Sequence, residues 1–484
     1  MKKYIYIIAF GLISTLFSCS DKTLDEIDTN PNITQDAPLS TLLPAAQMTV
    51  FQRVVGSISI ISGYASEHTN FTGLTTDSKS QVASGSLFSV SGGTNWTSAY
   101  QAIRYFTDIR GKADIAKRSG YSAIADIMSA YTLSLLVDAY GDIPYKEIGQ
   151  PGNIQPKFDK AEDIYIEIQK LLDSGILKCD QATTVDSRPG NDDMVFKGNM
   201  ALWKKTAWGL KARLLNRLSN VGPKDSDILS AINNSFASTE NFTVTGYLSN
   251  PENANPISNS FMSASTIVIA DGIVNTMKSF LDVNEDILIG DPRANIWFTK
   301  ISNKVITPPT SRANTDVTLN GTLYSKPLYM QNRTSPLPLF TFTELKFIEA
   351  EAQLRLGDKT KAYLAYEAAL RSSMAQSSIF NSAVALTATQ INTYLARPKV
   401  LMGADKLTLK DIIAQKYIFL FLFQSQEAYN DIRRTALISL NDPDGTAKRF
   451  AYPGDEMTRN SNAPQASNLE TIYQNNARLF WAKL

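Results

Sequence analysis

The sequence predicts a mostly α-helical protein in which tetratricopeptide-like helix pairs pack against an irregular, loop-rich ligand-binding region. Two observations predict the helices: apolar residues recur at spacings of three and four over several stretches, and small residues bracket a turn at Gly357-Asp358. A third predicts the irregular region. Residues from about 221 to 340 are rich in Asn, Ser, Thr and Pro and contain only short apolar runs. Loops on a rigid scaffold often carry binding functions.

The N-terminus has the features of a secretory signal. Lys2 and Lys3 precede an apolar stretch, Tyr4–Phe17, which is too short to span a bilayer. The stretch ends in Leu16-Phe17-Ser18-Cys19, the pattern of a bacterial lipoprotein signal with a loose fit at Phe17. We therefore expect residues 1–18 to be removed and Cys19 to be the site of lipid attachment. Ordinary cleavage nearby, which would release a soluble exported protein, is the alternative.

A tether and a body follow the predicted signal. Residues 19–38 are polar and acidic and contain Pro31 and Pro38, which predicts a flexible link between the lipid and the folded part. Residues 39–484 are expected to form one domain, with the stretch 221–340 as a loop-rich insert.

Helices are expected along most of the body. One apolar stripe runs from Ile124 to Leu135 and stops at Gly141. A second runs from Trp203 to Leu218, and its five cations are expected on a solvated or ion-paired face. A third, Leu345 to Leu356, leads into the Gly357-Asp358 turn, while the run Ile418–Phe423 has no polar side and should be buried all round. Within the insert, short apolar runs at 265–269 and 295–300 suggest small strands.

One helix pair has the small-residue pattern of a tetratricopeptide repeat. Ala350, Ala362 and Ala369 allow two antiparallel helices to approach closely, and Tyr366 fills the groove between them. A single repeat cannot bury its own apolar face, so partner pairs are expected, with 96–140 and 160–220 as degenerate candidates.

Composition and charge exclude several classes of function. Removal of Lys2 and Lys3 with the signal leaves 45 basic against 46 acidic residues, a net charge of −1, which argues against nucleic-acid binding. Besides Cys19 only Cys179 is present, so no intramolecular disulfide is expected, and Cys179 is interpreted as a buried small apolar residue.

Catalytic and metal-binding motifs are missing from the sequence. There is a single histidine, His68, and there is no HExxH motif, G-x-S-x-G elbow or P-loop. A carboxylate pair is left open because sequence does not report distances. Asp282-x-Asn284-x-Asp286 has the spacing of a calcium loop, but Ile287 and Arg293 stand where Gly and Glu are needed. We therefore predict no enzymatic activity, no cofactor and no metal.

Aromatic residues outside the helical motifs are candidate platforms for sugar rings. His68 is weighed between orienting a ligand and a structural role, and burial is as plausible as ligand contact for each aromatic ring. Trp96, Trp203, Trp208 and Trp481 are assigned to the core, and the charges at 427–434 are expected to pair with one another or to cap backbone groups. The candidate ligand-binding residues are Tyr64, His68, Phe71, Trp297, Tyr324 and Tyr329.

Nine sequence blocks, in order along nearly the whole mature chain, resemble the SusD/RagB nutrient-binding lipoproteins of Gram-negative outer membranes, in particular their second SusD-like branch. No block is specific by itself. The blocks are LLPAAQ (42–47), Trp96 with Tyr100, LVDAYGDIPYKEI (136–148), PKFDKAEDIYIEI (156–168), WKKTAWGLKAR (203–213), Asp291-Pro292-Arg293, ELKFIEAEAQLRLG (344–357), IIAQKYIFLFLFQSQEAYNDIRRT (412–435), and AYPGDEMTRN (451–460) with the terminal Trp481.

The resemblance implies four tetratricopeptide-like helix pairs and a lipid-anchored protein at the outer membrane that acts as the lid of a SusC-type TonB-dependent transporter. It implies an oligosaccharide ligand, or in some members a peptide. The acidic residues after Cys19 resemble the signal that sends such proteins to the cell surface, although Lys22 interrupts the run. Ligand loops differ between members, so no binding residue is carried over. A helical-repeat assembly or adhesion lipoprotein is the alternative from another class.

Overall fold

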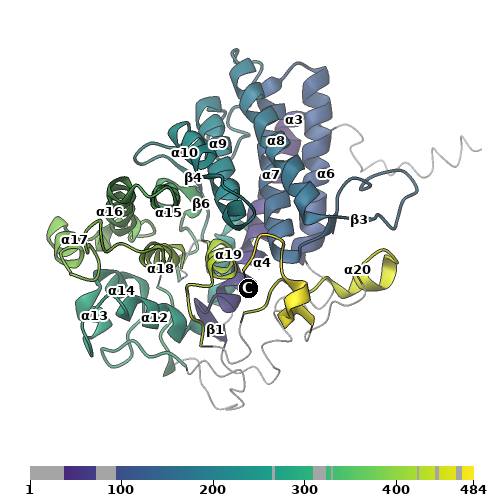
Figure 1. Ribbon diagram of the computed structural model, residues 1–484. Coiled ribbons are helices and arrows are strands. Elements are labelled where there is room, and N and C mark those ends of the chain that lie inside the picture. The colour runs from purple at the N-terminus through teal and green to yellow at the C-terminus, as the bar shows by residue number, and fades with distance from the viewer. Residues whose placement is uncertain are drawn as a thin grey trace, which may run out of the picture.

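The computed structural model describes residues 37–71, 94–263, 267–308, 323–328, 331–421, 424–441, 446–464 and 471–483 (Figure 1). It is mostly helical, as the sequence predicts, with a few short strands. Cys19 and Tyr329 lie outside the described residues.

The N-terminal part of the body consists of long helices with short connections. Three helical segments, α3, η1 and α4, follow one another without a break, and η1 is a π-helical stretch that begins five residues after Pro44. The elements are α3 (Leu39–Met48), η1 (Thr49–Val55), α4 (Gly56–Ala65), α6 (Thr94–Ile115), α7 (Ser119–Tyr140), α8 (Ala161–Gln181), α9 (Met200–Arg217), η2 (Leu218–Asn220) and α10 (Asp225–Asn233).

The rest of the chain adds shorter helices and two further pairs. They are η3 (Pro251–Asn253), α11 (Pro256–Ser263), α12 (Asp271–Lys278), α13 (Ile287–Gly290), α14 (Pro292–Trp297), α15 (Phe342–Arg355), α16 (Lys359–Gln376), η6 (Ser382–Val384), α17 (Ala388–Leu395), α18 (Leu409–Leu420), α19 (Ser425–Thr435), α20 (Gly454–Arg459), η7 (Thr471–Tyr473) and η8 (Asn475–Ala477).

Three two-stranded antiparallel sheets lie among the helices. They pair β1 (Thr69–Phe71) with β5 (Ile267–Ile269), β2 (Ile143–Pro144) with β3 (Phe158–Asp159), and β4 (Asn241–Val244) with β6 (Leu337–Thr341).

Helix pairs form the scaffold. The helices α6, α7 and α8 run side by side, and α15 packs against α16 near α18 (Figure 1). The α15/α16 pair confirms the repeat pattern, because Ala350, Ala362, Tyr366 and Ala369 are all buried between helices. Its turn uses Gly357 at a φ of 83°, in the left-handed region that glycine adopts without strain. Asp358 then caps α16 by accepting from the Lys361 backbone N–H at 2.9 Å.

One helix has the length and composition of a membrane span. Helix α7 is the single such helix in the described ranges, and its apolar window is completely buried inside the fold. It ends at Gly141, as predicted, where φ is 86°. The predicted apolar stripe is only part of what is buried, because polar residues such as Asp126 and Asp138 are buried too, as in the central helix of a packed bundle.

Charges inside the scaffold tie distant helices together. Arg213 and Arg217 of α9 are buried, not solvated, and pair with Glu344 of α15 and Glu427 of α19. Lys416 of α18 joins Glu351 to Asp431 at 3.3 and 2.9 Å. We call this set the ion-pair cluster: Asp138, Arg213, Arg217, Glu344, Glu351, Lys416, Glu427, Asp431 and Arg434. The predicted pairing of the charges at 427–434 is confirmed.

Two sequence-based expectations need correction. Residues 221–340 contain helices α10 to α14 as well as the predicted small strands, and 295–297 end helix α14 instead of starting a strand. Trp96, Trp203 and Trp481 are buried, but Trp208 is only half-buried, with the Lys211 ammonium 5.5 Å from its ring centre.

Candidate functional site

The strand pair β1/β5 is the base of the candidate site. Thr69 lies opposite Ile269 and Phe71 opposite Ile267. The ladder continues outward, since the backbone N–H of Ala270 donates to the carbonyl of His68 at 3.2 Å. Two segments about 200 positions apart therefore form one strand pair, in which Thr69 and all of β5 are buried.

The segment 323–328 adds to this strand pair on the free side of β5. Ser325 accepts from the Ile269 backbone at 3.0 Å and donates to the Ile306 carbonyl at 2.8 Å, and its hydroxyl accepts from the Ile306 N–H at 3.0 Å. Lys326 accepts from the Thr299 backbone at 2.9 Å. We call the assembly of residues 64–71, 267–270, 297–306 and 323–328 the platform.

His68 lies inside the platform and not on its surface. Its Nε2 is 3.2 Å from the carbonyl oxygen of Tyr417, so Nε2 carries the proton, and Nδ1 accepts from the Ser425 hydroxyl at 3.2 Å. Desolvation by burial lowers the pKa of His68 to about 3, against the opposing effect of the hydrogen bond to Tyr417. The His68 ring is neutral and fully buried, and both of its nitrogens are hydrogen-bonded. These features support a structural role over ligand binding for His68.

Trp297 is not a loop aromatic. It ends helix α14, is 1% exposed, and donates through Nε1 to the Ser377 carbonyl at 3.0 Å. The Arg293 guanidinium lies 5.5 Å from its ring centre. A sugar has no access to this ring in the structure, so its proximity to the platform reflects packing.

The other predicted residues lie at the platform with different exposure. Tyr324 is half-buried beside Ser325, and Tyr64 is half-buried at the end of α4, against the core. Phe71 ends β1. The structure thus gathers five of the six candidate residues on one platform, and the rings of Tyr64 and Tyr324 are partly exposed.

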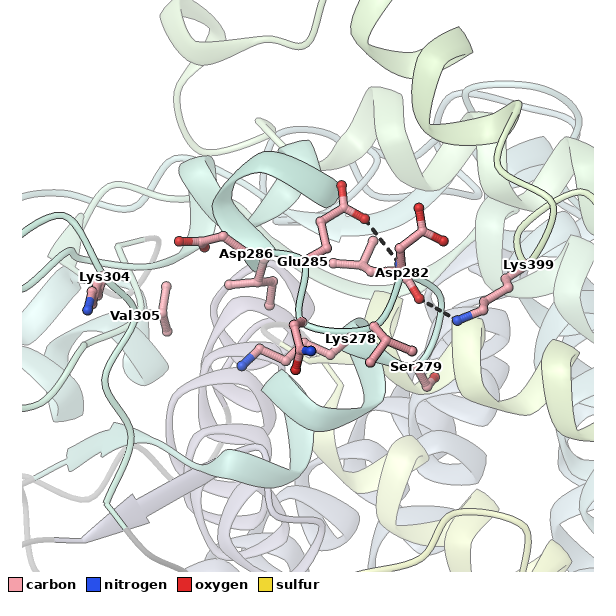
Figure 2. A pocket seen from close by; sticks show the side chains of 12 residues that line it. Lys278, Ser279, Asp282, Glu285, Asp286, Lys304, Val305 and Lys399 are labelled. Atoms are coloured by element: carbon pink, nitrogen blue, oxygen red, sulfur yellow. Dashed lines mark hydrogen bonds between the residues drawn. The ribbon is translucent and has the colours of Figure 1, made fainter.

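A pocket of about 550 Å³ adjoins the platform at the turn between α12 and α13 (Figure 2). We call it the α12–α13 pocket. Lys304 and Val305, next to the Ile306 of the platform, form one wall, and Lys278, Asp282 and Lys399 contribute to the others. The Lys399 ammonium donates to the Leu281 carbonyl at 2.5 Å.

Two acids of the turn that carries the calcium-like spacing, Asp286 and Glu285, form hydrogen bonds within the protein. Asp286 caps α13 by accepting from the Leu288 N–H at 2.9 Å. Glu285 accepts two hydrogen bonds from Arg397 at 2.7 and 2.6 Å, and these hold the pKa of its carboxyl below the ordinary value. Within the described ranges no group of three or more His, Cys, Asp or Glu could hold a metal ion.

Sequence reasoning missed the lysines of the α12–α13 pocket. Lys278, Lys304 and Lys399 come from three separate segments, and no local pattern singles them out. In the sequence only the Asp282-x-Asn284-x-Asp286 spacing pointed to this turn, and it suggested a calcium loop instead of a pocket lined by lysines.

Comparison with models of known protein families identifies one family. A SusD-like family, described as starch-binding associating with outer membrane, matches residues 31–453. No curated protein matches the chain.

Solved structures share the fold. A SusD/RagB family protein from Bacteroides thetaiotaomicron superposes with a TM-score of 0.75 at 21% identity, covering 93% of this chain and 99% of its own. A chitin-binding protein gives 0.70 at 21% identity over 92% and 100%. A chitin-binding SusD homologue from Flavobacterium johnsoniae gives 0.71 at 18% identity over 91% and 98%.

Proposed function

Because the chain belongs to the SusD-like family of starch-binding proteins that associate with the outer membrane, we propose that it is a surface-exposed nutrient-binding lipoprotein. It captures an oligosaccharide and delivers it to a SusC-type TonB-dependent transporter. In this proposal residues 1–18 are the signal peptide, Cys19 is lipidated, and residues 19–38 link the lipid to the body. The family is one of binding proteins, so no catalytic residue is assigned.

The observation that carries the proposal is the extent of the family match. It spans residues 31–453, and therefore includes both the helix pairs and the platform. The family's description as starch-binding and two chitin-binding solved relatives support a glycan as the ligand. The almost neutral net charge of the sequence suits an uncharged glycan.

We assign the oligosaccharide to the platform. Tyr324 is the best-placed ring, because it is partly exposed and lies beside Ser325, which holds the segment to β5. An aromatic face and neighbouring polar groups are what a sugar ring requires. Tyr64 is a second candidate on the same platform.

Titration calorimetry with maltoheptaose and chitohexaose tests the ligand class. We expect one of the two to bind and Tyr324→Ala to weaken that binding. Tyr363→Ala is the matched control, because Tyr363 is also half-buried but lies on α16. Equal loss in both variants would argue against the platform, and failure of both saccharides to bind would argue against a starch- or chitin-like ligand.

Co-purification tests the transporter partner. Gentle detergent extraction of native outer membranes, with this protein as the bait, should recover a large TonB-dependent barrel. Recovery of no barrel, under conditions that keep other outer-membrane complexes intact, would favour an assembly or adhesion role instead.

Peptide binding is the second candidate, and the α12–α13 pocket favours it. The described residues that line this pocket include lysines and carboxylates but no aromatic ring. Groups of both signs suit the charged ends and side chains of a short peptide better than a neutral sugar. Binding of a tryptic peptide mixture that is lost in Lys278→Ala/Lys399→Ala, but kept in Tyr324→Ala, would support this alternative.

A further inference from the structure

A second pocket, of about 930 Å³, shares no lining residue with the platform or with the α12–α13 pocket. It is enclosed by α6, the segment 144–156 and α20, and we call it the α6 pocket. In Figure 1, β3 and α20 lie at the right of the view, whereas α12 and α13 lie at the lower left. The α6 pocket is therefore separate from the platform and from the α12–α13 pocket.

The floor of the α6 pocket is aromatic and apolar. Trp96 is 5% exposed and is held by edge contacts to Tyr100, Tyr140 and Tyr452, with ring centres 5.0 to 6.0 Å apart. Ile148 adds an aliphatic surface. These ring contacts hold the floor rigid. A ligand would therefore bind without a loss of conformational entropy in these side chains.

The walls are fixed in advance as well. The Tyr100 hydroxyl donates to the Pro144 carbonyl at 2.8 Å, which ties the segment 144–156 to α6. From the other side, the Asn460 amide donates to the Pro156 carbonyl at 2.9 Å. Most small-molecule sites are preformed pockets of this size range, with few polar groups over an apolar floor.

Two charged groups at the rim of the pocket have no ion-pair partner. Arg104 and Asp108 lie one turn apart on the exposed face of α6, a spacing at which opposite charges usually pair, yet neither forms an ion pair within the described part of the chain. The indole N–H of Trp96, which lines the pocket, has no acceptor among the described residues.

We propose that the α6 pocket is a second carbohydrate-binding site, for one or two sugar rings of a neutral oligosaccharide. An apolar floor takes the C–H face of a pyranose, while the Arg104 guanidinium and the Trp96 N–H donate to its hydroxyls and the Asp108 carboxylate accepts from them. A single anion or cation would meet charges of both signs, Arg104 against Asp108 and Glu456, and a purely apolar ligand would leave Arg104 and Asp108 unpaired. The inference rests on the proposed function, and it adds a second contact for a long chain of sugars.

The test uses the full-length protein with 15N-labelled tryptophan. There are only five indole signals, so Trp96→Phe assigns the signal of interest. We expect saturating maltoheptaose or chitohexaose to shift the Trp96 indole resonance. Calorimetry should give a stoichiometry of two oligosaccharides per protein chain. Arg104→Ala/Asp108→Ala, which keeps the net charge, should abolish the shift and reduce the stoichiometry to one. Tyr324→Ala should weaken binding at the platform and leave the Trp96 shift in place.

The control is Glu167→Ala/Lys170→Ala on α8, which removes one acid and one base from an exposed helix face. It should bind like the wild type. If calorimetry shows saccharide binding but the Trp96 resonance does not shift, the second site is contradicted while the proposed function stands. The same holds if a tryptic peptide mixture shifts the resonance and saccharides do not. Absence of saccharide binding by calorimetry would overturn it together with the proposed carbohydrate ligand.

Discussion

Glu351 of α15 and Arg434 of α19, 83 positions apart, form a buried ion pair with 2.6 Å between Oε2 and Nη2. Burial alone would raise the pKa of Glu351, but the charges of Arg434 and Lys416 outweigh it and hold the pKa below the ordinary value. The pair joins two of the helix pairs of the scaffold at their common core.

Loss of this carboxylate should be costly. Glu351→Gln leaves Lys416 and Arg434 with Asp431 as their remaining ion-pair partner, and breaking a buried pair from one side costs about 3–5 kcal/mol. Urea unfolding followed by circular dichroism measures the free energy of unfolding. The control is Glu367→Gln, which breaks the more exposed pair with Arg371 and should change stability much less. Equal effects in the two variants would mean that the cluster does not stabilise the fold.

Acid should destabilise the protein through His68. Its pKa is about 3 when folded and about 6.5 when unfolded, so the unfolded chain binds the proton between these values and stability falls as the pH is lowered. The expected slope is about 1.4 kcal/mol per pH unit between pH 6 and 5, above the usual carboxylate range. His68→Gln, the variant of the single histidine, should lack this slope. Parallel pH profiles of the two proteins would contradict a buried neutral His68.

Glycine in α9 is required by packing. A Cβ at Gly209 would lie 2.1 Å from Phe340 Cε1 and 2.7 Å from Ser235 Oγ, so Gly209→Ala should destabilise the protein by about 1–3 kcal/mol. Gly111→Ala on α6 is the control, because a Cβ there has no atom within 4 Å and helix propensity predicts a gain of about 0.5–1 kcal/mol. Thermal unfolding of both variants measures the difference. An unchanged melting temperature in Gly209→Ala would show that β6 can move away from α9.

Two rings of the platform should behave differently. Trp297→Ala removes a buried indole and should lower stability by about 3–5 kcal/mol. Tyr324→Ala should leave the melting temperature almost unchanged and weaken saccharide binding by roughly tenfold, the loss of about 1.4 kcal/mol of ring contact. Differential scanning fluorimetry and calorimetry measure the two effects. A Tyr324→Ala variant that melts early would assign this ring to the core as well.

Substitution of each cysteine should distinguish the predicted site of lipid attachment, Cys19, from the buried residue Cys179. Cys19→Ala should move the protein from the membrane fraction to the soluble fraction. Cys179→Ala should stay in the membrane, because Cys179 is a buried residue of α8 and burial raises the pKa of its thiol to about 12. Fractionation followed by immunoblotting measures this. Membrane retention of Cys19→Ala would mean that cleavage and anchoring occur differently from the proposal.

The sequence predicted what local patterns encode. The α15/α16 pair was readable because Ala350, Ala362 and Tyr366 must face one another whatever the rest of the chain does. The end of α7 at Gly141 could also be predicted, because glycine readily adopts the positive φ found there. Helix periodicity and turn chemistry act over a few residues, and a single sequence contains all of that information.

Contacts between segments far apart in the sequence could not be predicted. Arg213 was expected on a solvated or ion-paired face, and only the position of Glu344 decides in favour of a buried ion pair. Trp297 resembled a loop aromatic until α14 and Ser377 enclosed it. Both pockets likewise depend on segments that meet only in the folded chain, so neither could be predicted from spacing alone.

The position of α4 has a consequence for how the chain must fold. This apolar N-terminal helix packs against α19, and β1, which follows it, pairs with β5. Helix pairs with short turns form from local contacts and therefore quickly, whereas contacts between such distant segments form late because a long loop must close first. During synthesis the apolar surface of α4 stays exposed until α19 has emerged. A chaperone that shields residues 56–65 over that interval would keep the chain from aggregating before its site exists.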